Sequence, residues 1–475
     1  MTLKPLIAIC GTTGVGKSRL AIELALALPS SGKIINADAM QVYEGLDVLT
    51  NKVQISEQQG VEHLLMSFKK PDEQYFVGEW IKDAEREVDK IHAEGKVPIV
   101  VGGTSYWIHH LLFPNSLPAL ATTLKNHTAS PSPRLLDALS VLPERLASLY
   151  NALPSTSPSA KIDPDQAFAL HSLLSYLDPI MASRWHWKDT RKVLRNLEII
   201  KESGRLASEV VADAHTANTT KGYRTLILWL YSEPALLNTR LEQRIDEMLS
   251  VGLSSLSLIA TLSYSPCNCS KAFWMRFALQ DVPHEDIKRP DFTLGVYQAI
   301  GYKELYQYVD GICDVDQQGF TAAVVEMKLN TKKYAQRQVK WIRNKLLPAV
   351  QACNMISHQK QGVSTISAYL LDATEVDTAW EANVLTNAKK IAESFLSGRD
   401  IPNPLTLSSL AHDMLSVPVR PMNPTEIIQS RRKSVCSVCS LHVERPVMLE
   451  EGREWEAHQR TRMHKRMLQR ATQRV

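Results

Sequence analysis

The fold of this chain is decided by the stretch Gly11-Thr12-Thr13-Gly14-Val15-Gly16-Lys17-Ser18. An apolar run at 6–10 precedes it, and an apolar-periodic segment at 20–28 follows it. These patterns predict a strand, a glycine-rich turn and a helix, with the spacing Gly-x4-Gly-Lys-[Ser/Thr] of a phosphate-binding loop. An ordinary glycine turn is the alternative, but the flanking strand and helix patterns disfavour it.

Each residue type in this loop suits the binding of a polyphosphate. The glycines let the backbone turn tightly and present its N–H groups to phosphate oxygens, and the helix N-terminus adds a partial positive charge. Lys17 supplies a full charge, and the hydroxyl of Ser18 is a ligand for phosphate-bound Mg²⁺. The loop therefore predicts a polyphosphate ligand, but it does not say what reaction that ligand undergoes.

Length and composition predict a protein of several globular units. The chain has 475 residues, of which 44% are hydrophobic and 22% charged, and its formal net charge is +4. No apolar run is long enough to span a bilayer, and no signal peptide precedes the first predicted strand. The seven cysteines are mostly scattered, which favours a reducing compartment over a disulfide framework. We expect no membrane partner and a cytoplasmic location, with mitochondrial and nuclear pools left open.

Strand and helix patterns alternate after the loop. Buried strands are predicted at 33–38, 97–101 and 225–231, and helices at 75–95, 105–112 and 234–248. A second glycine turn, Gly102-Gly103-Thr104, closes the strand at 97–101. This alternation predicts an α/β fold, a P-loop NTPase-like core with a parallel sheet of right-handed βαβ units.

The predicted strand at 33–38 ends in a carboxylate, Asp38, which Ala39, Met40 and Gln41 follow. In open α/β sheets the residues at the carboxyl ends of strands line the ligand crevice, which would place Asp38 opposite the phosphates bound at 11–18. A helix N-cap is the other interpretation, since Asp is favoured at that position. The residues alone leave both interpretations open.

An insertion divides the predicted core. Between 114 and 188 the chain is rich in Pro, Ser, Ala and Leu, so we expect a helical insertion between a first core part at 1–113 and a second at 189–347. A helical pattern at 166–203 contains Lys192, with Arg191 and Arg195 on one face; a solvated helix face is the plain alternative. Residues 253–282 show no clear period, and 348–433 are interpreted as a mixed segment and a linker.

A basic helix and a zinc-binding pattern favour an RNA partner. The helix predicted at 327–347 is rich in Lys and Arg with Tyr334 and Trp341 interleaved, and phosphates pair with such cations while bases stack on such rings. Residues 434–475 are expected to form a matrin- or U1-like finger with a basic tail and Trp455 in its core. Its Zn²⁺ ligands would be Cys436, Cys439, His458 and His464, although eighteen residues separate Cys439 from His458, and His442 is a competing candidate.

Three classes of function fit these parts. The first is a nucleoside or nucleotide kinase, and the second is an RNA-modifying transferase whose loop holds a diphosphate-bearing donor. The third is a zinc-finger RNA-binding protein, non-catalytic on RNA, whose loop domain only hydrolyses nucleotide. The basic helix and the finger disfavour the first class, and the lack of a clear Walker B strand weakens the first and the third.

Seven motifs in order resemble those of the tRNA dimethylallyltransferase (tRNA isopentenyltransferase) family, in its eukaryotic form with a C-terminal zinc finger. The resemblance covers about 1–347 and the finger. The chain departs from the family pattern after 251–253, where a Ser/Leu/Cys-rich stretch replaces an acidic helix. Besides the loop at 11–18, the matching motifs lie at 36–43, 101–104, 189–198, 241–244, 298–303 and 334–341.

This resemblance implies the reaction and the roles of the residues. A dimethylallyl group would pass from dimethylallyl diphosphate to the exocyclic amine of adenosine at tRNA position 37, beside the anticodon, after the base leaves its stack. Residues 11–18 and Mg²⁺ would hold the diphosphate, Thr13 and Arg244 would assist its departure, and Asp38 would accept or orient the amine proton. We expect a monomer whose insertion and finger hold the anticodon stem. Implied tRNA contacts are Asp38, Ala39, Met40, Gln41, Thr104, Arg191, Lys192, Arg195, Gln298, Gly301, Tyr302 and Lys303.

Overall fold

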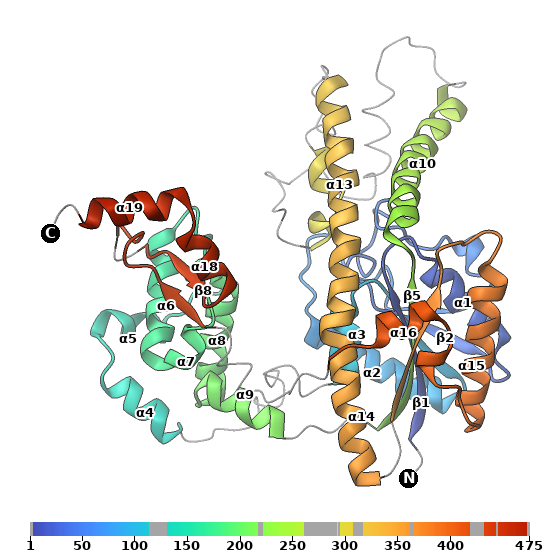
Figure 1. The fold of residues 1–475 in the computed structure, drawn as a ribbon, viewed down its shortest axis with the longest axis horizontal. Helices are drawn as coiled ribbons and strands as arrows, with labels where there is room; N and C mark the ends of the chain where they lie inside the picture. Colours follow the sequence, from blue (N-terminus) through green and yellow to red (C-terminus); the bar gives the residue numbers. More distant parts are fainter. Residues whose placement is uncertain are drawn as a thin grey trace. The chain divides into compact units, whose positions relative to one another are not determined.

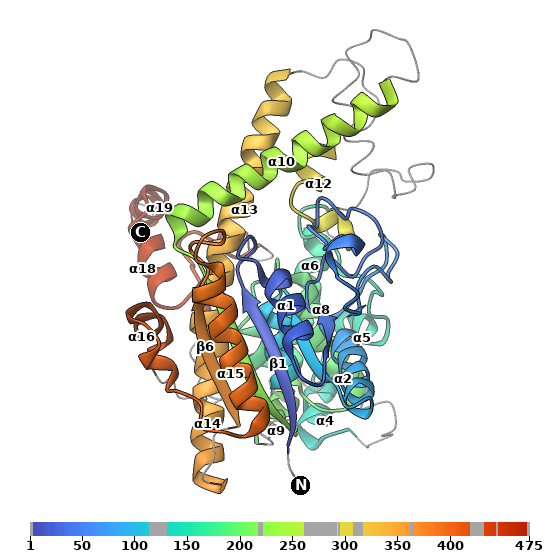
Figure 2. The same ribbon diagram turned by 90° about the vertical axis from the view of Figure 1, so that its right-hand side faces the viewer.

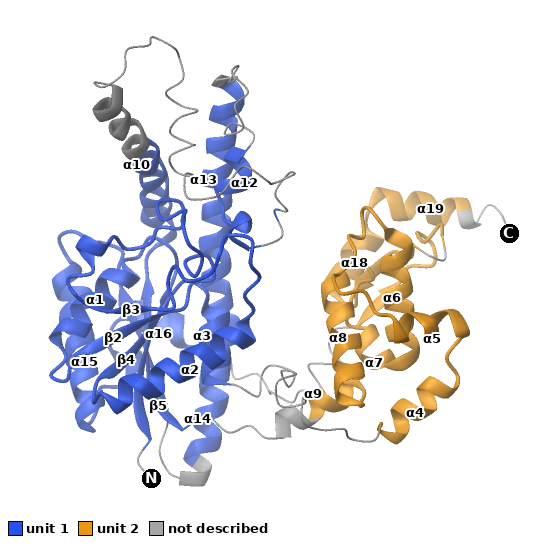
Figure 3. Cartoon of the chain, turned by 180° about the vertical axis from the view of Figure 1, so that it is seen from behind, with its two compact units in different colours: residues 1–113, 220–420 blue, residues 114–219, 421–475 orange. Residues whose placement is uncertain are grey.

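The computed structural model describes residues 3–113, 131–216, 222–260, 292, 295–306, 317–361, 365–418, 432–442 and 445–472. Within it the chain forms two compact units (Figure 3). Unit 1 consists of Met1–Phe113 and Thr220–Arg420, and unit 2 of Pro114–Thr219 and Pro421–Val475. None of the described helices is both long and apolar enough to cross a membrane.

Unit 1 is built on a six-stranded sheet of order β3-β2-β4-β1-β5-β6 in which every pair of neighbours is parallel. The α/β fold with a parallel sheet is therefore confirmed. The central strand β1 is buried from Leu6 onward, because its continuous apolar run packs against helices on both faces. The strands are β1 (Lys4–Gly11), β2 (Gly32–Asn36), β3 (His63–Leu64), β4 (Val97–Val101), β5 (Tyr223–Tyr231) and β6 (Ile366–Asp372).

Helices cover both faces of this sheet (Figures 1 and 2). On one face lie α1 (Lys17–Ala27) and α15 (Thr386–Ser397), whose apolar sides share a core with alternate residues of β1, β4 and β5. On the other face lie α2 (Val77–Ala93), α3 (Ser105–Leu112) and α14 (Leu347–Gln361). The remaining helical segments of unit 1 are η1 (Ile55–Glu57), α10 (Pro234–Ala260), η4 (Gly295–Gln298), α12 (Tyr302–Leu305), α13 (Gln317–Trp341), η6 (Ile342–Leu346), η7 (Trp380–Leu385), η8 (Pro404–Thr406) and α16 (Ser409–Leu415).

Two long helices of unit 1 extend beyond their predicted ends. Helix α10 continues to Ala260 rather than ending near 248, and α13 begins at Gln317 rather than 327. The two helices pack together, with Ile245 and Met327 in one apolar cluster, and they exchange ion pairs. Two lysines of the predicted basic helix, Lys328 and Lys332, therefore pair with acids on α10. The aperiodic stretch from 261 to 282 lies outside the described residues.

Unit 2 contains the helical insertion. The predicted helical stretch at 166–203 is divided, because the side chain of Asp178 accepts a hydrogen bond from the backbone N–H of Met181 (3.1 Å) and caps a new helix. Helices α8 and α9, which lie beyond the sequence-based boundary at 188, pack with α6 in one core of unit 2. The helices are α4 (Pro133–Ser140), α5 (Glu144–Asn151), α6 (Pro164–Leu177), α7 (Pro179–Ala182), α8 (Thr190–Ser203) and α9 (Ala207–Thr216).

The C-terminal segment of unit 2 docks on this insertion. Trp187 Nε1 donates to Pro446 O (2.9 Å), Lys433 N donates to Ser183 O (2.7 Å), and Met448 packs against Trp187. Trp455, the expected core residue, remains partly exposed. The segment is thus one body with the insertion. Its elements are β7 (Lys433–Val435), β8 (Met448–Glu450), α18 (Arg453–Gln459) and α19 (Arg462–Thr472), and β7 and β8 are antiparallel.

Candidate active site

The loop at 11–18 connects β1 to α1 at the carboxyl edge of the sheet. Gly14 (φ 82°) and Gly16 (φ 80°) adopt left-handed conformations that side chains disfavour, which explains glycine at both positions. Lys17 Nζ donates to Thr12 O (2.6 Å). Removal from water lowers the pKa of Lys17 to about 8; the Asp38 carboxylate opposes this shift, and the Arg244 guanidinium adds to it.

A second cation, Arg244 of α10, points at the same loop. Its Nη1 donates to Thr13 Oγ1 (2.8 Å), and burial lowers its pKa to about 10, so it stays charged at neutral pH. Its Nε is buried without a hydrogen-bond partner, as is Thr12 Oγ1. Buried donors without partners are costly unless a ligand accepts from them, so this corner of the loop suits an anion.

Asp38 follows the end of β2 and is held by local hydrogen bonds. Its backbone N donates to Asn36 Oδ1 (3.0 Å), and its Oδ1 accepts from Met40 N (3.0 Å). The residues after it form turns and no helix, so of the two interpretations the helix N-cap is excluded. A Cβ at Gly103 would lie 2.9 Å from Asp38 Oδ2, so glycine at 103 gives the carboxylate room at the same sheet edge.

Two residues of α13, one turn apart, complete the site. The amide of Gln338, 5% exposed, accepts from Thr13 N through Oε1 (2.9 Å) and donates to Gly103 O through Nε2 (2.9 Å). Tyr334 forms side-chain hydrogen bonds with Thr104 and Gln338; its burial and the Asp38 charge raise its pKa. The sequence pattern predicts base stacking for Tyr334, whereas in the structure its side chain bonds to Thr104 and Gln338. The spacing of Tyr334 and Gln338, four residues apart on one helix face, was the signal in the sequence.

The turn that follows β2 and the turn that follows β4 are joined by a hydrogen bond. Thr104 Oγ1 accepts from Ala39 N (3.0 Å), which connects the turn after β4 to the turn after β2. Gln41 Nε2 donates to Thr50 O (3.1 Å) and Asn51 O (3.0 Å), so this side chain supports the loop that follows. Asp38 and Thr104 therefore belong to one rigid group at the carboxyl edge.

The segment at 298–303 lies in unit 1, over η4 and α12. Gln298 Nε2 donates to Gly295 O (3.2 Å), and Gly301 has a φ of 99°. Tyr302 is 1% exposed and packs on Tyr297, with ring centroids 5.2 Å apart, whereas Lys303 is exposed. Of this group the side chains of Gln298 and Lys303 are exposed to solvent.

The basic residues at 191–195 lie on α8 in unit 2. Arg195 forms ion pairs with Glu198 (2.8 Å) and Glu202 (3.6 Å), and Lys192 Nζ lies over the Trp185 ring, 4.7 Å from its centroid. The loop at 11–18 lies in unit 1, so these residues belong to a different unit from the loop. Lys192 and Trp185 together form a basic and aromatic surface of unit 2.

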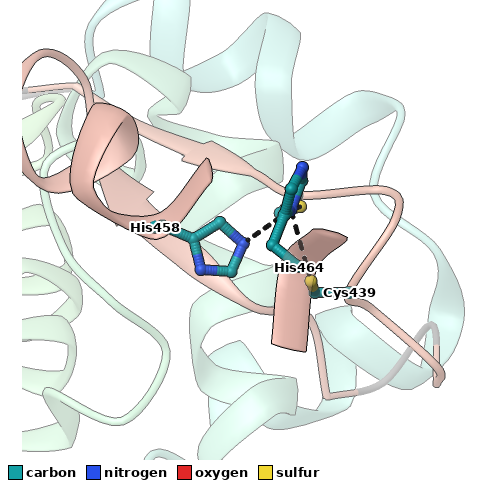
Figure 4. Close-up of side chains that lie close together, drawn as sticks. Cys439, His458 and His464 are labelled. Carbon is teal, nitrogen blue, oxygen red and sulfur yellow. Dashed lines mark hydrogen bonds between the residues drawn. The ribbon is translucent and has the colours of Figure 1, made fainter. Parts of the chain in front are cut away.

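Four side chains of the C-terminal segment form a group that could hold a metal ion, and Figure 4 shows three of them, Cys439, His458 and His464. The Sγ atoms of Cys436 and Cys439 each lie 3.5 Å from His464 Nδ1, and His458 Nε2 lies 3.1 Å from that nitrogen. All four ligand atoms lie within 4.8 Å of one another. Tetrahedral bonds of about 2.0–2.3 Å require separations of roughly 3.3–3.8 Å. The two Sγ–Nδ1 separations of 3.5 Å lie in this range, so small shifts of the other ligand atoms would complete a tetrahedral site. His442 is exposed and outside this group.

Comparisons with known proteins agree along the chain. A family model described as IPP transferase matches residues 41–345. A tRNA dimethylallyltransferase of Schizosaccharomyces pombe is 32% identical over 100% of this chain and 97% of its own length, and one of Homo sapiens is 30% identical over 97% and 85%. A solved eukaryotic dimethylallyltransferase, described as acting on tRNA, has a TM-score of 0.69 and 29% identity and covers 99% of this chain and 98% of its own.

Proposed function

Because this chain belongs to the IPP transferase family of tRNA dimethylallyltransferases, we propose that it transfers a dimethylallyl group from dimethylallyl diphosphate to an adenosine of tRNA. The acceptor would be the exocyclic amine of the adenosine at position 37, beside the anticodon. One observation carries the proposal: a cationic loop and a carboxylate lie at the same sheet edge, and the amide of Gln338 joins the loop at Thr13 to Gly103, which lies beside the Asp38 carboxylate.

The donor side of the site would hold the diphosphate. Residues 11–18 offer backbone N–H groups, and Lys17 and Arg244 offer two cations that converge on the loop. Negative charge develops on the diphosphate as its bond to the isoprenoid carbon breaks, and preorganised cations stabilise that charge. Thr13 would orient Arg244 through the hydrogen bond between them.

The acceptor side would bind the flipped adenine. Its amine nitrogen forms a bond to the first carbon of the dimethylallyl group while the carbon–oxygen bond to the diphosphate breaks, and the amine loses one proton. Asp38 Oδ2 is the base that would accept it, because Oδ1 is engaged by Met40 N. The hydroxyl of Thr104 would contact the substrate nucleotide. The transfer consumes no oxidant or reductant, and its products are isopentenyladenosine and diphosphate.

Two metal ions fit this account. Ser18 opens α1 beside Lys17, and its hydroxyl would hold Mg²⁺, which supplies further positive charge to the diphosphate. Cys436, Cys439, His458 and His464 are a donor set that Zn²⁺ takes in structural sites. The zinc would be structural, since four protein ligands leave no position for a substrate.

Further contacts would hold the tRNA. Its sugar–phosphate backbone would meet the exposed side chains of Arg191 and Lys192 and the partly exposed Arg195, and Lys303 with Gln298 would reach the anticodon region. We also propose a monomeric enzyme of the cytoplasm, with mitochondrial and nuclear pools.

The proposal is tested by giving the purified chain an anticodon stem-loop together with either labelled dimethylallyl diphosphate or labelled ATP. We expect the label of dimethylallyl diphosphate to appear in RNA and the label of ATP to stay in nucleotide. Turnover of ATP without labelled RNA would contradict the proposal and favour a kinase or a nucleotide hydrolase.

A further inference from the structure

The segment at 366–385 packs directly on the loop that binds phosphate. It follows the region matched by the family model and comprises β6, which extends the sheet beside β5, and η7, which contacts α1. Figure 2 shows β6 and α15 alongside β1 and α1. The sequence suggested only a mixed segment here, without any role.

Trp380, the first residue of η7, lies against the loop. It is 1% exposed, and a Cβ at Gly16 would meet its ring at 2.7 Å, so the indole lies where a side chain would otherwise begin. The Arg19 guanidinium stacks on the ring at 4.5 Å, and Trp380 Nε1 donates to Glu23 Oε2 (2.8 Å). The indole is therefore fixed from three directions at the N-terminus of α1.

Arg240 of α10 ties the same segment to the loop a second time. Its Nη1 donates to Gly14 O (3.1 Å) and Ala373 O (3.3 Å), and its Nη2 donates to Thr374 O (2.7 Å). One guanidinium thus joins the backbone of the loop to the backbone that follows β6. These bonds are independent of the indole contacts.

We propose that Trp380 and Arg240 are positioning residues that hold the loop at 11–18 in its anion-binding shape before the donor arrives. The proposal rests on the assignment of this loop to the diphosphate of the donor. A loop with two left-handed glycines is flexible, and ordering it on binding would cost affinity. The indole packed on Gly16 and the guanidinium bonded to Gly14 O remove that cost in advance. Neither residue touches the acceptor side of the site.

The test is steady-state kinetics of Trp380→Leu and Arg240→Met at saturating anticodon stem-loop, with inorganic diphosphate as a product inhibitor. We expect each substitution to raise the KM for dimethylallyl diphosphate about tenfold or more, since displacement of a binding group by about 1 Å costs factors of this order. The inhibition constant of diphosphate should rise in parallel, while the KM for the stem-loop stays within about twofold. Trp380→Phe keeps an aromatic ring at this position but lacks the outer indole atoms that face Gly16, so it should restore only part of the donor affinity.

Phe395→Leu is the matched control. Phe395 is as buried as Trp380 and lies on α15 in the same core, under the Arg224 guanidinium, and has no contact with the loop. It should lower the unfolding midpoint without changing the KM for the donor. An unchanged donor KM in Trp380→Leu, or in Arg240→Met if the tryptophan variant does not fold, would overturn the proposal. Equal increases in the KM for the donor and in the KM for the stem-loop would also overturn the proposal. A wild-type chain that transfers nothing would instead overturn the proposed function.

Discussion

Lys17 carries its charge where little water reaches it. Because this removal from water lowers its pKa to about 8, the free enzyme loses the proton of Lys17 as the pH rises through that value. Only the protonated amine attracts diphosphate. We therefore expect kcat/KM for the donor to be constant below about pH 7 and to fall above about pH 8.

The measurement is a pH profile at saturating stem-loop, with Lys17→Arg as the comparison. Arginine keeps its charge over this range, so the fall above pH 8 should disappear even though the variant is less active overall. A decline at the same pH in both proteins would assign it to another group.

Asparagine has nearly the same shape as aspartate but cannot accept a proton as the Asp38 carboxylate can. In Asp38→Asn the amide oxygen still accepts from Met40 N, so the turn is kept while the base is lost. We expect the chemical step in single-turnover experiments to slow by about 10²–10⁴-fold, with the affinities for donor and tRNA changed little. A normal single-turnover rate would remove Asp38 from the chemistry.

Gln338 allows a test of the bridge between donor and acceptor sides. In Gln338→Glu an ionised carboxylate accepts from Thr13 N but repels Gly103 O, so transfer at neutral pH should fall by about 10–10²-fold. A protonated carboxyl can again donate to Gly103 O. The activity of the variant relative to wild type should therefore rise as the pH is lowered, whereas Gln338→Leu should show no such recovery. A pH-independent ratio for the glutamate variant would contradict the role of this bridge.

At the scale of elements, the C-terminal finger and the helical insertion stabilise each other. The hydrogen bond from Trp187 to Pro446 O and the packing of Met448 require the fold that the metal ligands hold. Chelation of the metal, or Cys439→Ser, should lower the unfolding midpoint of unit 2 by several degrees, since about 1 kcal/mol corresponds to roughly 2–4 °C in a unit of this size. Calorimetry and hydrogen exchange of the Lys433 amide would measure this.

His442→Ala provides the control for the finger, because His442 is exposed and outside the ligand group. It should change neither the midpoint nor the exchange of Lys433. At saturating Mg²⁺, Cys439→Ser should also leave the KM for the donor unaltered, since the loop at 11–18 lies in unit 1. A midpoint indifferent to chelation would show that the insertion does not depend on the metal.

Elements with a strong local pattern could be predicted from the sequence, and elements defined by distant contacts could not. The strand–loop–helix at 6–28 and the strand at 97–101 carry their pattern in consecutive residues. The break at Asp178 depends on a cap in a continuous helical pattern, and the docking of Met448 on Trp187 joins segments far apart in the chain. The strand β6 is a short mixed run at the edge of the sheet, and among the described strands it pairs with β5.

The same distinction between local sequence patterns and distant contacts applies to the candidate site. Residues 11–18, Asp38 and Thr104 follow successive strands of one parallel sheet, and the carboxyl ends of such strands meet at one edge. Gln338 binds Thr13 across 325 positions of sequence, and Arg240 reaches the loop from α10. No periodicity in the sequence reports contacts of this kind. The sequence predicts base stacking for Tyr334, because an aromatic residue in a basic helix gives the same sequence pattern whether its side chain faces RNA or the enzyme's own active site.

On the scale of the whole molecule, the chain builds one site from two distant parts. The first part carries the loop, Asp38 and Thr104, and the second, beyond the insertion, supplies Arg244, Tyr334 and Gln338. Unit 2 consists of the insertion between these parts, which carries Lys192 over Trp185, and of the C-terminal segment, which carries the metal-ligand group. We infer that the chemistry belongs to unit 1 and that unit 2 contributes to holding the RNA.

The central claim is that the bound diphosphate is a leaving group and that an adenosine beside the anticodon receives the isoprenoid. The most direct measurement is a single-turnover reaction of the purified chain with dimethylallyl diphosphate and a stem-loop carrying adenosine or guanosine at position 37. Released diphosphate and modified nucleoside, identified by mass spectrometry, are counted together. The account predicts one diphosphate released for each isopentenyladenosine formed, and no product with guanosine. Diphosphate release without modified RNA, or modification of the guanosine stem-loop, would contradict it.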